Sequence, residues 1–328
     1  MGCKTGMMRS SDAKSKISVV IPLYNEEGNV AAVAADVIKY TAPFAEVELI
    51  FIDDGSQDNT LTEIKKIASK ESGVFYLSLS RNFGHQNALR AGLDIATGGA
   101  VITMDGDMQH PPELLPELIN KWREGYEIVF TVRRDTDESF WFKRTTSALF
   151  YRIMNSMAGI RLHEGSADFR LLDRKVVDAL KNMQENAVFY RGLISWVGFR
   201  QCSLSYVPHC RIHGSSKYSV RKMFRLALDG MTAFSFLPLR LAAITGLFIA
   251  FLAFFYVLYA FFVKFFTDQA ISGWLSIMAG IYFLGGIQLL FIGLCGEYIG
   301  RIFMEVKRRP HYLVAEEKVP VEKDMNNR

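Results

Sequence analysis

Residues 100–114 read AVITMDGDMQHPPEL, a short uncharged run followed at once by two carboxylates and a proline-containing turn. The run from Ala100 to Met104 is typical of a buried strand, and Asp105 and Asp107 come directly after it. Asp-x-Asp by itself occurs in many loops, but its place at a strand end favours a functional role. We therefore predict a polar site where this strand ends.

Further strands are predicted on both sides of this segment, and on its N-terminal side they alternate with helices. Strands are predicted at 17–23, 47–52 and 74–80, with a further strand at 127–132, and helices at 29–40, from near residue 60, and at 85–97. Asp58 or Asn59 can cap the second helix. Strands that alternate with helices predict an α/β fold, with a mostly parallel sheet covered on both faces.

Polar clusters follow three of these strands. They read Tyr24-Asn25-Glu26, Asp53-Asp54-Gly55-Ser56 and Asp105-Gly106-Asp107. Ligands of such sheets bind beyond the carboxyl ends of the strands, so we expect the three clusters to form one site. Two carboxylates two residues apart suit a hard divalent cation such as Mg²⁺ or Mn²⁺. Such a cation would neutralise the negative charge that develops on a nucleotide diphosphate leaving group.

Two long runs without charge, 241–263 and 271–296, stand in the last part of the chain. Each exceeds the roughly 20 residues that cross a bilayer as a helix. A pair of buried core helices is the alternative, but soluble cores rarely need two such runs in succession. Basic residues crowd the outer flanks, while the connection 264–270 holds one. The positive-inside rule thus predicts a multi-pass protein of the cytoplasmic membrane, with both termini and the N-terminal domain in the cytoplasm.

The segment before the first run has apolar and basic positions at helical spacing. This pattern predicts an amphipathic helix at the membrane interface, and an ordinary surface helix with a basic edge is the alternative. The expected organisation is an N-terminal tail (1–16), a cytoplasmic α/β domain (17–216), the amphipathic helix (217–238), two transmembrane helices (239–300) and a cytoplasmic tail (301–328). A further aromatic-rich helix is expected at 140–157.

Composition and residue spacing argue against several other functions and features. The 328 residues carry a net charge of +4, which gives no bulk electrostatic basis for nucleic-acid binding. The four cysteines lack Cys-x-x-Cys spacing and are expected to be free thiols, and the local set Cys202, His209, Cys210 and His213 lacks zinc spacing. No signal peptide is expected, because the first apolar run is short and contains Pro22.

Several motifs occur in a fixed order along the chain. They are VIPLYNEE at 20–27, DDGS at 53–56, RNFG at 81–84, DGDMQHPPE at 105–113, DFRLLDR at 168–174, GSSKY at 214–218 and GEYIGR at 296–301. In these motifs the chain resembles the family 2 glycosyltransferases, and within them the polyprenyl-phosphate glycosyltransferases of the GtrB-like and dolichol-phosphate mannose synthase-like kinds. The resemblance covers nearly the whole chain. It implies a GT-A (Rossmann-like) domain and metal-dependent, inverting transfer of a sugar to a polyprenyl (undecaprenyl) phosphate, with UDP-glucose as the first candidate donor.

The resemblance also implies residue roles. Residues around the nucleotide would be Pro22, Tyr24, Glu26, Asp53, Asp54 and Arg81. The metal would be held by Asp105, Asp107 and Gln109, and the acceptor phosphate would be met by Arg133, Lys143 and Ser147. Lys143 stands where some members have arginine, and Gly106 where the family usually has alanine.

The acceptor can also be considered from its chemistry. A sugar hydroxyl needs a carboxylate base, whereas a phosphate monoester, with a second pKa near about 6, arrives ionised and needs only steering. Arg133, Lys143 and Lys217 could cradle such a phosphate at a membrane. Asp168 is a catalytic candidate as a base or as an orienting group, and a structural pair with Arg170 or Arg174 is the alternative. His85 and His110 are candidates for phosphate contact or turn residues.

Other functions fit parts of the pattern. The donor could be GDP-mannose or a modified UDP-sugar, and a homo-oligomer is plausible from the resemblance. A transferase that extends polysaccharides is the rival enzyme, but the Gln-x-x-Arg-Trp motif of processive members is missing. A non-catalytic membrane scaffold is the rival of another class, and the intact polar clusters at three strand ends argue against it.

Overall fold

The structure, a computed structural model, describes residues 15–133, 166–183, 185, 190–207, 237–266 and 273–320. By their contacts these residues fall into two units. The first is globular and contains the residues up to Tyr218 together with those from Pro310 onward, and the second contains the helices between them.

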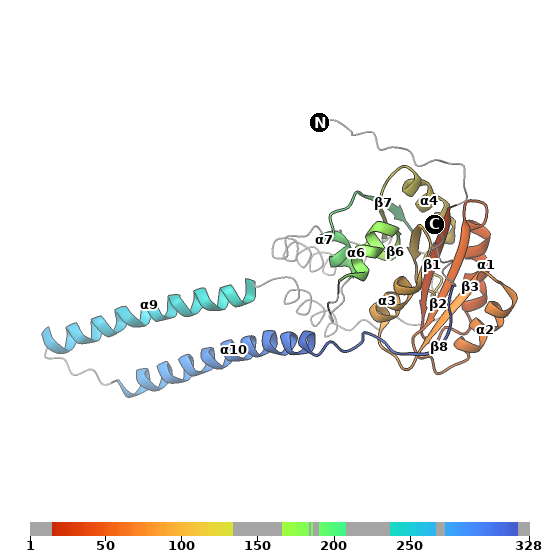
Figure 1. Cartoon of the computed structure of the whole chain (residues 1–328). Coiled ribbons are helices and arrows are strands. Elements are labelled where there is room, and N and C mark those ends of the chain that lie inside the picture. Colours follow the sequence, from red (N-terminus) through yellow and green to blue (C-terminus); the bar gives the residue numbers. More distant parts are fainter. Residues whose placement is uncertain are drawn as a thin grey trace, which may run out of the picture. The chain divides into compact units, whose positions relative to one another are not determined.

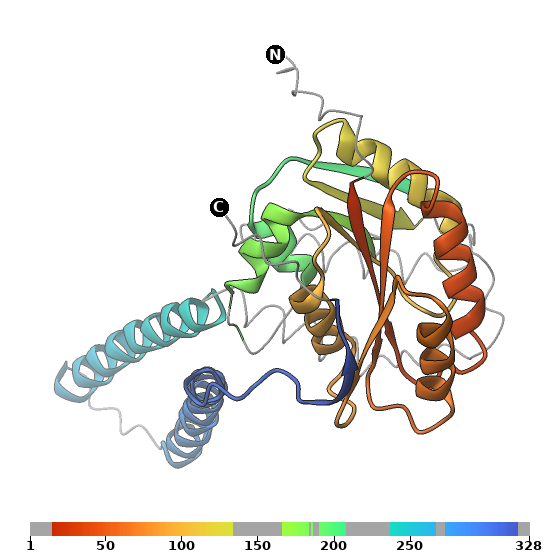
Figure 2. The ribbon, with the colours of Figure 1, turned by 45° about the vertical axis from the view of Figure 1, so that its right-hand side comes forward.

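The globular unit is built on one mixed sheet, drawn in Figures 1 and 2. Its strands are β1 (Lys16–Leu23), β2 (Glu46–Asp53), β3 (Val74–Leu79), β4 (Ala100–Thr103), β5 (Ile128–Arg133), β6 (Ser166–Asp173), β7 (Gln201–Tyr206) and β8 (Val314–Lys318). Their order is β7-β5-β6-β4-β1-β2-β3-β8. Strands β4, β1, β2 and β3 run parallel, while β6 is antiparallel to β4 and β5, and β8 is antiparallel to β3.

Helices cover both faces of this sheet, as Figure 2 shows. One face carries α1 (Val30–Thr41), α2 (Thr60–Lys70) and α4 (Leu115–Arg123), and the other carries α3 (His85–Ile95), α6 (Arg174–Lys181) and α7 (Tyr190–Trp196). The central strands β1 and β2 are buried on both sides, which is why most of their residues are apolar; Glu48 of β2 is a buried exception. The predicted α/β fold is confirmed.

The predicted strands and helices of residues 17–133 agree with the structure to within one or two residues at their ends. Asn59 occupies the N-cap position of α2 without a side-chain capping bond, while Asp58 before it accepts a hydrogen bond at Oδ1 from the backbone N of Thr60, the first residue of the helix, at 3.0 Å. Helix α4 and strand β6, which contains the motif at 168–174, are not among the predicted elements, and β8 lies within the segment predicted as a tail. The expected helix at 140–157 lies outside the described residues.

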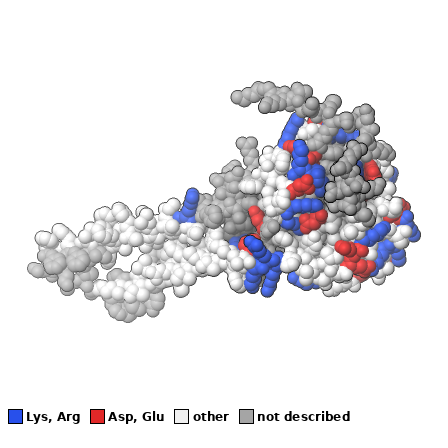
Figure 3. All heavy atoms as spheres, viewed as in Figure 1, with Lys and Arg blue, Asp and Glu red and all other residues white. Residues whose placement is uncertain are grey.

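The second unit contains two long helices, α9 (Leu237–Phe266) and α10 (Trp274–Val306). Each is long and apolar enough to cross a membrane: Leu239–Tyr256 has a mean hydropathy of 2.0 and Phe283–Val306 one of 1.5. Figure 3 shows mainly uncharged atoms along both helices. Helix α10 continues past the predicted boundary at residue 300, and an ion pair between Arg301 and Glu297, with Nη2 3.2 Å from Oε1, supports its added turns. The predicted helix at 217–238 lies almost wholly outside the described residues.

Candidate active site

The first two polar clusters meet where the neighbouring strands β1 and β2 end. The backbone N of Asp54 donates to the carbonyl of Leu23 at 2.9 Å, and the backbone N of Asn25 donates to Ser56 Oγ at 3.0 Å. In return, Asn25 Oδ1 accepts from the backbone N of Gln57 at 2.8 Å. The two loops are therefore one bonded structure, as the sequence predicted for clusters at adjacent strand ends.

Asp53 and Asp54 use their carboxylates to shape these loops. Asp53 accepts from the backbone N of Ser56 at 3.1 Å and from Ser78 Oγ at 2.8 Å. Asp54 accepts from the backbone N of Phe83 at 2.7 Å and of Gly84 at 3.0 Å. Burial raises the pKa of Asp54 above its usual value, although the two amide hydrogen bonds oppose the shift. Asp54 thus ties the loop after β3 to the end of β2.

Gly55 is required by the close approach of these loops. Its φ is +69°, and a Cβ there would lie 2.5 Å from the carbonyl carbon of Arg81. Arg81 itself is exposed, with its guanidinium over the Phe83 ring at 4.2 Å from the centroid. The predicted nucleotide residues Asp53, Asp54 and Arg81 therefore come from one compact group of loops.

The third cluster, at the end of β4, is held by His110. The buried His110 ring accepts a hydrogen bond at Nδ1 from the backbone N of Asp105 at 3.0 Å, and it stacks on Phe169 with centroids 5.1 Å apart. The backbone N of Gln109 donates to Asp107 Oδ1 at 3.1 Å, and Met108 between them has a φ of +61°. His110 thus supports the Asp-x-Asp loop, which corresponds to the turn-residue alternative that the sequence left open for it.

The carboxylates of this loop fit a divalent cation in part. Asp105 Oδ1 is buried and lacks a hydrogen-bond donor, and Asp107 follows two residues on. Among the described residues, no group of three His, Cys, Asp or Glu side chains converges on one point. Mg²⁺ and similar ions are commonly bound by one or two carboxylates together with substrate phosphates. The donors present therefore suit a cation whose remaining ligands come from a diphosphate.

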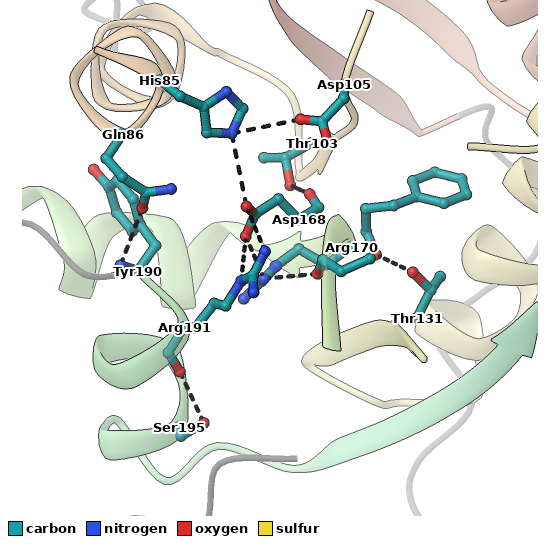
Figure 4. A network of polar contacts seen from close by, with 12 residues as sticks. His85, Gln86, Thr103, Asp105, Thr131, Asp168, Arg170, Tyr190, Arg191 and Ser195 are labelled. Carbon is teal, nitrogen blue, oxygen red and sulfur yellow. Dashed lines mark hydrogen bonds and ion pairs between the residues drawn. The ribbon is translucent and has the colours of Figure 1, made fainter. Parts of the chain in front are cut away.

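Asp168, from β6, is the centre of a buried charged network (Figure 4). Arg191 of α7 donates to both of its oxygens, from Nε to Oδ1 at 3.1 Å and from Nη2 to Oδ2 at 3.0 Å. Arg170 Nη2 donates to Oδ1 at 2.8 Å. Burial alone would raise the pKa of Asp168, but Arg191, His85 and Arg170 outweigh it and hold this pKa well below the usual range. Asp168 is therefore ionised at neutral pH.

His85, the first residue of α3, joins this network to the Asp-x-Asp loop. Its Nε2 lies 3.4 Å from Asp105 Oδ1 and 3.7 Å from Asp168 Oδ2, as Figure 4 shows. Burial tends to lower the pKa of His85, but the two carboxylates outweigh burial and raise it above the ordinary value of 6.5. Arg174, the other partner proposed for Asp168, bonds instead to backbone carbonyls of Ala96 and Gly98.

The other predicted residues come from β1 and the loop after it, from the end of β5, or from beyond the described residues. Pro22 is in β1 paired with Ile52, Tyr24 is 43% exposed in the following loop, and Glu26 Oε2 accepts from Asn29 Nδ2 at 2.6 Å. Arg133 ends β5 on the exposed side, in register with Tyr206. Lys143, Ser147 and Lys217 lie outside the described residues.

Sequence reasoning missed Arg191, because no motif links it to Asp168 across the intervening chain. The only available signal was an arginine next to the aromatic Tyr190 at the start of a short helix. Its side chain stays 39% exposed while it binds Asp168, so it also presents positive charge to solvent.

A mostly parallel α/β sheet with an acidic strand-end site, accompanied by a pair of long apolar helices, defines a GT-A type enzyme with a helical hairpin. Family comparison agrees: residues 18–181 match "Glycosyl transferase family 2", and residues 237–302 match "GtrB C-terminal hairpin". The chain belongs to glycosyl transferase family 2 and is a glycosyltransferase.

Relatives match along nearly the whole chain. An uncharacterized glycosyltransferase, YkcC, of Bacillus subtilis (strain 168) is 42% identical, over 90% of this chain and 92% of its own length. The bactoprenol glucosyl transferase of Shigella phage SfV is 41% identical, over 92% of this chain and 99% of its own. Among solved structures, a Pyrobaculum calidifontis mannosyltransferase in complex with GDP-Man and Mn²⁺ is similar, with a TM-score of 0.47 and 17% identity, over 68% of this chain and 64% of that one.

Proposed function

We propose that this enzyme transfers glucose from UDP-glucose to a polyprenyl phosphate, with inversion at the anomeric carbon and with dependence on Mg²⁺ or Mn²⁺. The name of the phage relative, a bactoprenol glucosyl transferase, supports the sugar and the acceptor. The observation that carries the proposal is Asp105 Oδ1, a buried carboxylate oxygen that accepts no hydrogen bond and has only an ion-pair contact with His85 Nε2 at 3.4 Å among the described residues, at the strand end that also bears Asp107.

The metal would be held by Asp105 and Asp107, with Gln109 beside them. When bound, it would offset the negative charge that builds on the departing nucleotide diphosphate. His110 and the backbone of the loop keep the two carboxylates in place, as their hydrogen bonds indicate. The nucleotide would lie among Pro22, Tyr24, Glu26, Arg81 and the loops that Asp53 and Asp54 organise.

The acceptor needs no general base, because a phosphate monoester is already ionised at neutral pH. This agrees with Asp168, whose low pKa and arginine partners make it a poor proton acceptor. We assign Asp168 the role of orienting Arg191 and His85 around the reacting groups. Arg133, Lys143, Ser147 and Lys217 would bind the acceptor phosphate.

We further propose that α9 and α10 span the cytoplasmic membrane, with the globular unit and both termini in the cytoplasm. Their length and apolar composition fit two spans, and basic residues are concentrated on the outer flanks of the pair, while the connection 264–270 holds one. A polyprenyl phosphate presents its head group at the bilayer surface, so a membrane-anchored transferase would meet it there. A homo-oligomer is compatible with this arrangement.

The test uses membranes that contain the full chain, undecaprenyl phosphate and a panel of nucleotide sugars, with the glycolipid identified by mass. UDP-glucose should give a hexosyl lipid whose anomeric configuration is opposite to that of the donor. Asp105→Asn and Asp107→Asn should each lower transfer by at least about 100-fold, as expected for loss of a catalytic metal. The matched control is Asp178→Asn, since that carboxylate is 56% exposed on α6.

Two outcomes would overturn the proposal. Full activity of Asp105→Asn without added metal would remove the metal from the mechanism. Transfer to an oligosaccharide, with none to the lipid phosphate, would identify the polysaccharide-extending alternative.

A further inference from the structure

Residues 310–320, here called the post-hairpin segment, lie beyond both stretches that match family models. They follow α10 along the chain but belong to the globular unit. Strand β8 within them extends the sheet by pairing antiparallel with β3, from Tyr76 opposite Lys318 to Leu79 opposite Val314. The last strand at one edge of the catalytic sheet therefore comes from the part of the chain that follows the two long helices.

Side chains add to this backbone pairing. Glu316 accepts from Lys65 Nζ of α2 at 2.6 Å and from Tyr76 Oη at 2.9 Å. Lys318 Nζ donates to the carbonyl of Val74 at 3.0 Å and also to that of Ala68. Exposed ion pairs contribute little by themselves, so the strand pairing and the bonds to backbone carbonyls should carry most of the attachment.

The contact of the segment with β3 ends where the loop 81–84 begins. The backbone N of Ser80 donates to the carbonyl of Leu313 at 2.8 Å. The next residue is Arg81, and the loop continues to Phe83 and Gly84, whose amides bond to Asp54. One end of this loop is therefore fixed by Asp54 and the other by the post-hairpin segment.

A second contact reaches α3, the helix that begins with His85. Tyr312 Oη donates to Asp94 Oδ2 at 3.0 Å, and Arg90 Nε lies 3.6 Å from the same oxygen. Arg90 also donates to the carbonyls of Met183 at 2.7 Å and Lys181 at 3.0 Å, which joins α3 to the end of α6. Tyr312 thus supports the helix whose first residue faces Asp105 and Asp168.

We infer that the post-hairpin segment is a positioning element of the active site, which holds the loop 81–84 and α3 in the geometry that binds the nucleotide. The inference rests on the proposed function for the identity of the ligand. The simpler role of an edge strand is to cover the free edge of β3 against aggregation. The two roles differ in what they predict for loop 81–84, because edge cover alone leaves nucleotide binding unchanged.

The experiment compares two truncations of the full chain in membranes or detergent. One ends after Arg309 and removes the segment, and the matched control ends after Pro320 and keeps it. Removal should speed hydrogen exchange of the Phe83 and Gly84 amides by about tenfold or more, as expected when a loop loses one of its two anchors. The KM for the nucleotide sugar should rise by about tenfold with a smaller change in kcat, because the loop is placed before chemistry begins.

A peptide of residues 310–320 added to the shorter chain should restore slow exchange by pairing with β3. If the shorter chain does not fold, Tyr312→Phe replaces it, with Tyr40→Phe as the control, since Tyr40 Oη bonds Glu113 at 3.3 Å on the exposed surface of α1. Tyr312→Phe should raise the KM by about fivefold, the usual effect of one lost hydrogen bond.

Unchanged amide exchange and unchanged KM in the shorter chain, or equal behaviour of the two tyrosine variants, would overturn the inference. The exchange measurement needs no sugar transfer. Failure of the intact chain to glucosylate the lipid would therefore reject the proposed function while the exchange comparison still decides the role of the segment.

Discussion

Arg191 binds both carboxylate oxygens of Asp168, with Nε 3.1 Å from Oδ1 and Nη2 3.0 Å from Oδ2. This two-point contact links α7 to β6 next to the Asp-x-Asp loop. Since Arg170 also donates to Asp168, the carboxylate faces two guanidinium groups. Two charge-assisted contacts therefore hold Asp168 in its ionised form and fix the guanidinium of Arg191 next to the Asp-x-Asp loop.

Replacing Arg191 with lysine should test whether activity needs the two-point hydrogen bonding of the guanidinium group or only its positive charge. Lysine keeps the charge but cannot donate to both oxygens of Asp168, so we expect kcat/KM to fall by about 10- to 100-fold with the fold intact. The control is Arg200→Lys, where the guanidinium lies over the Tyr126 ring on the surface, 4.4 Å from its centroid. Equal activities of the two variants would show that Arg191 has no positioning role.

The link between His110 and Asp105 leads to a second prediction. His110→Ala leaves the backbone N of Asp105 without its acceptor and empties space beside Phe169, whereas His110→Asn can restore an acceptor oxygen. We expect His110→Ala to weaken Mn²⁺ binding by about tenfold and His110→Asn to weaken it less. Titration of Mn²⁺ by electron paramagnetic resonance in the presence of the nucleotide measures the Mn²⁺ affinity of both variants. The prediction fails if the asparagine variant binds Mn²⁺ as weakly as the alanine variant.

The N-terminal half of the fold could be predicted closely because its signals are local. Apolar runs such as the one before Asp105 mark the predicted strands and helices within a few residues, although helix α4 (Leu115–Arg123) was not predicted. The meeting of the first two strand-end clusters, after β1 and β2, followed from one rule of parallel sheets, and Asn25 and Ser56 show it as a direct hydrogen bond.

The Asp168 network and the placement of β8 could not be predicted, because they depend on pairings between residues far apart in the sequence, which local patterns do not encode. Asp168 meets Arg191 because β6 runs antiparallel between β4 and β5, and no periodicity marks that placement. The segment around Val314 carries charged residues typical of a tail, yet it pairs with β3 because the edge of the sheet offers free backbone groups. Its position could be found only from the folded chain.

Glu48 gives a prediction for the dependence of stability on pH. This buried residue of β2 accepts from the backbone N of Thr97 at 2.9 Å, pairs with Lys16 Nζ at 3.0 Å, and is hydrogen-bonded by Ser18. Burial would raise the pKa of Glu48, but these bonds outweigh it and hold the pKa below the ordinary value of 4.5. The ionised form therefore stabilises the fold above about pH 4.5, and this contribution is lost as pH falls through the lower, folded-state pKa.

Glu48→Gln should lower the free energy of unfolding of the globular unit by about 1–3 kcal/mol at pH 7, because charged hydrogen bonds in a buried site are lost. Its melting temperature should then vary less than that of the unaltered chain as pH falls below about 4.5. The control is Glu46→Gln, an exposed position on the same strand. Thermal unfolding followed across pH distinguishes the two, and parallel curves for Glu48→Gln and the unaltered chain would contradict the assignment.

Gly106 separates the two metal-binding candidates, and Leu23 explains why it is glycine. A Cβ at this position would lie 2.1 Å from Leu23 Cδ2 and 3.4 Å from Ile21 Cγ2, and Leu23 is buried at the end of β1. Gly106→Ala must therefore move the side chain of Leu23 within the core. We expect a loss of about 1–3 kcal/mol in stability, the usual cost of overpacking, together with weaker metal binding.

The double variant Gly106→Ala with Leu23→Val provides the decisive comparison, because valine lacks the Cδ2 atom that alanine would meet. Leu23→Val alone should destabilise the globular unit by about 1 kcal/mol through lost packing. The double variant should be more stable than the sum of the single effects by about 1 kcal/mol or more, which is the signature of residues in contact. Additive effects would mean that Leu23 does not set the size limit at Gly106, and that alanine is excluded there for another reason.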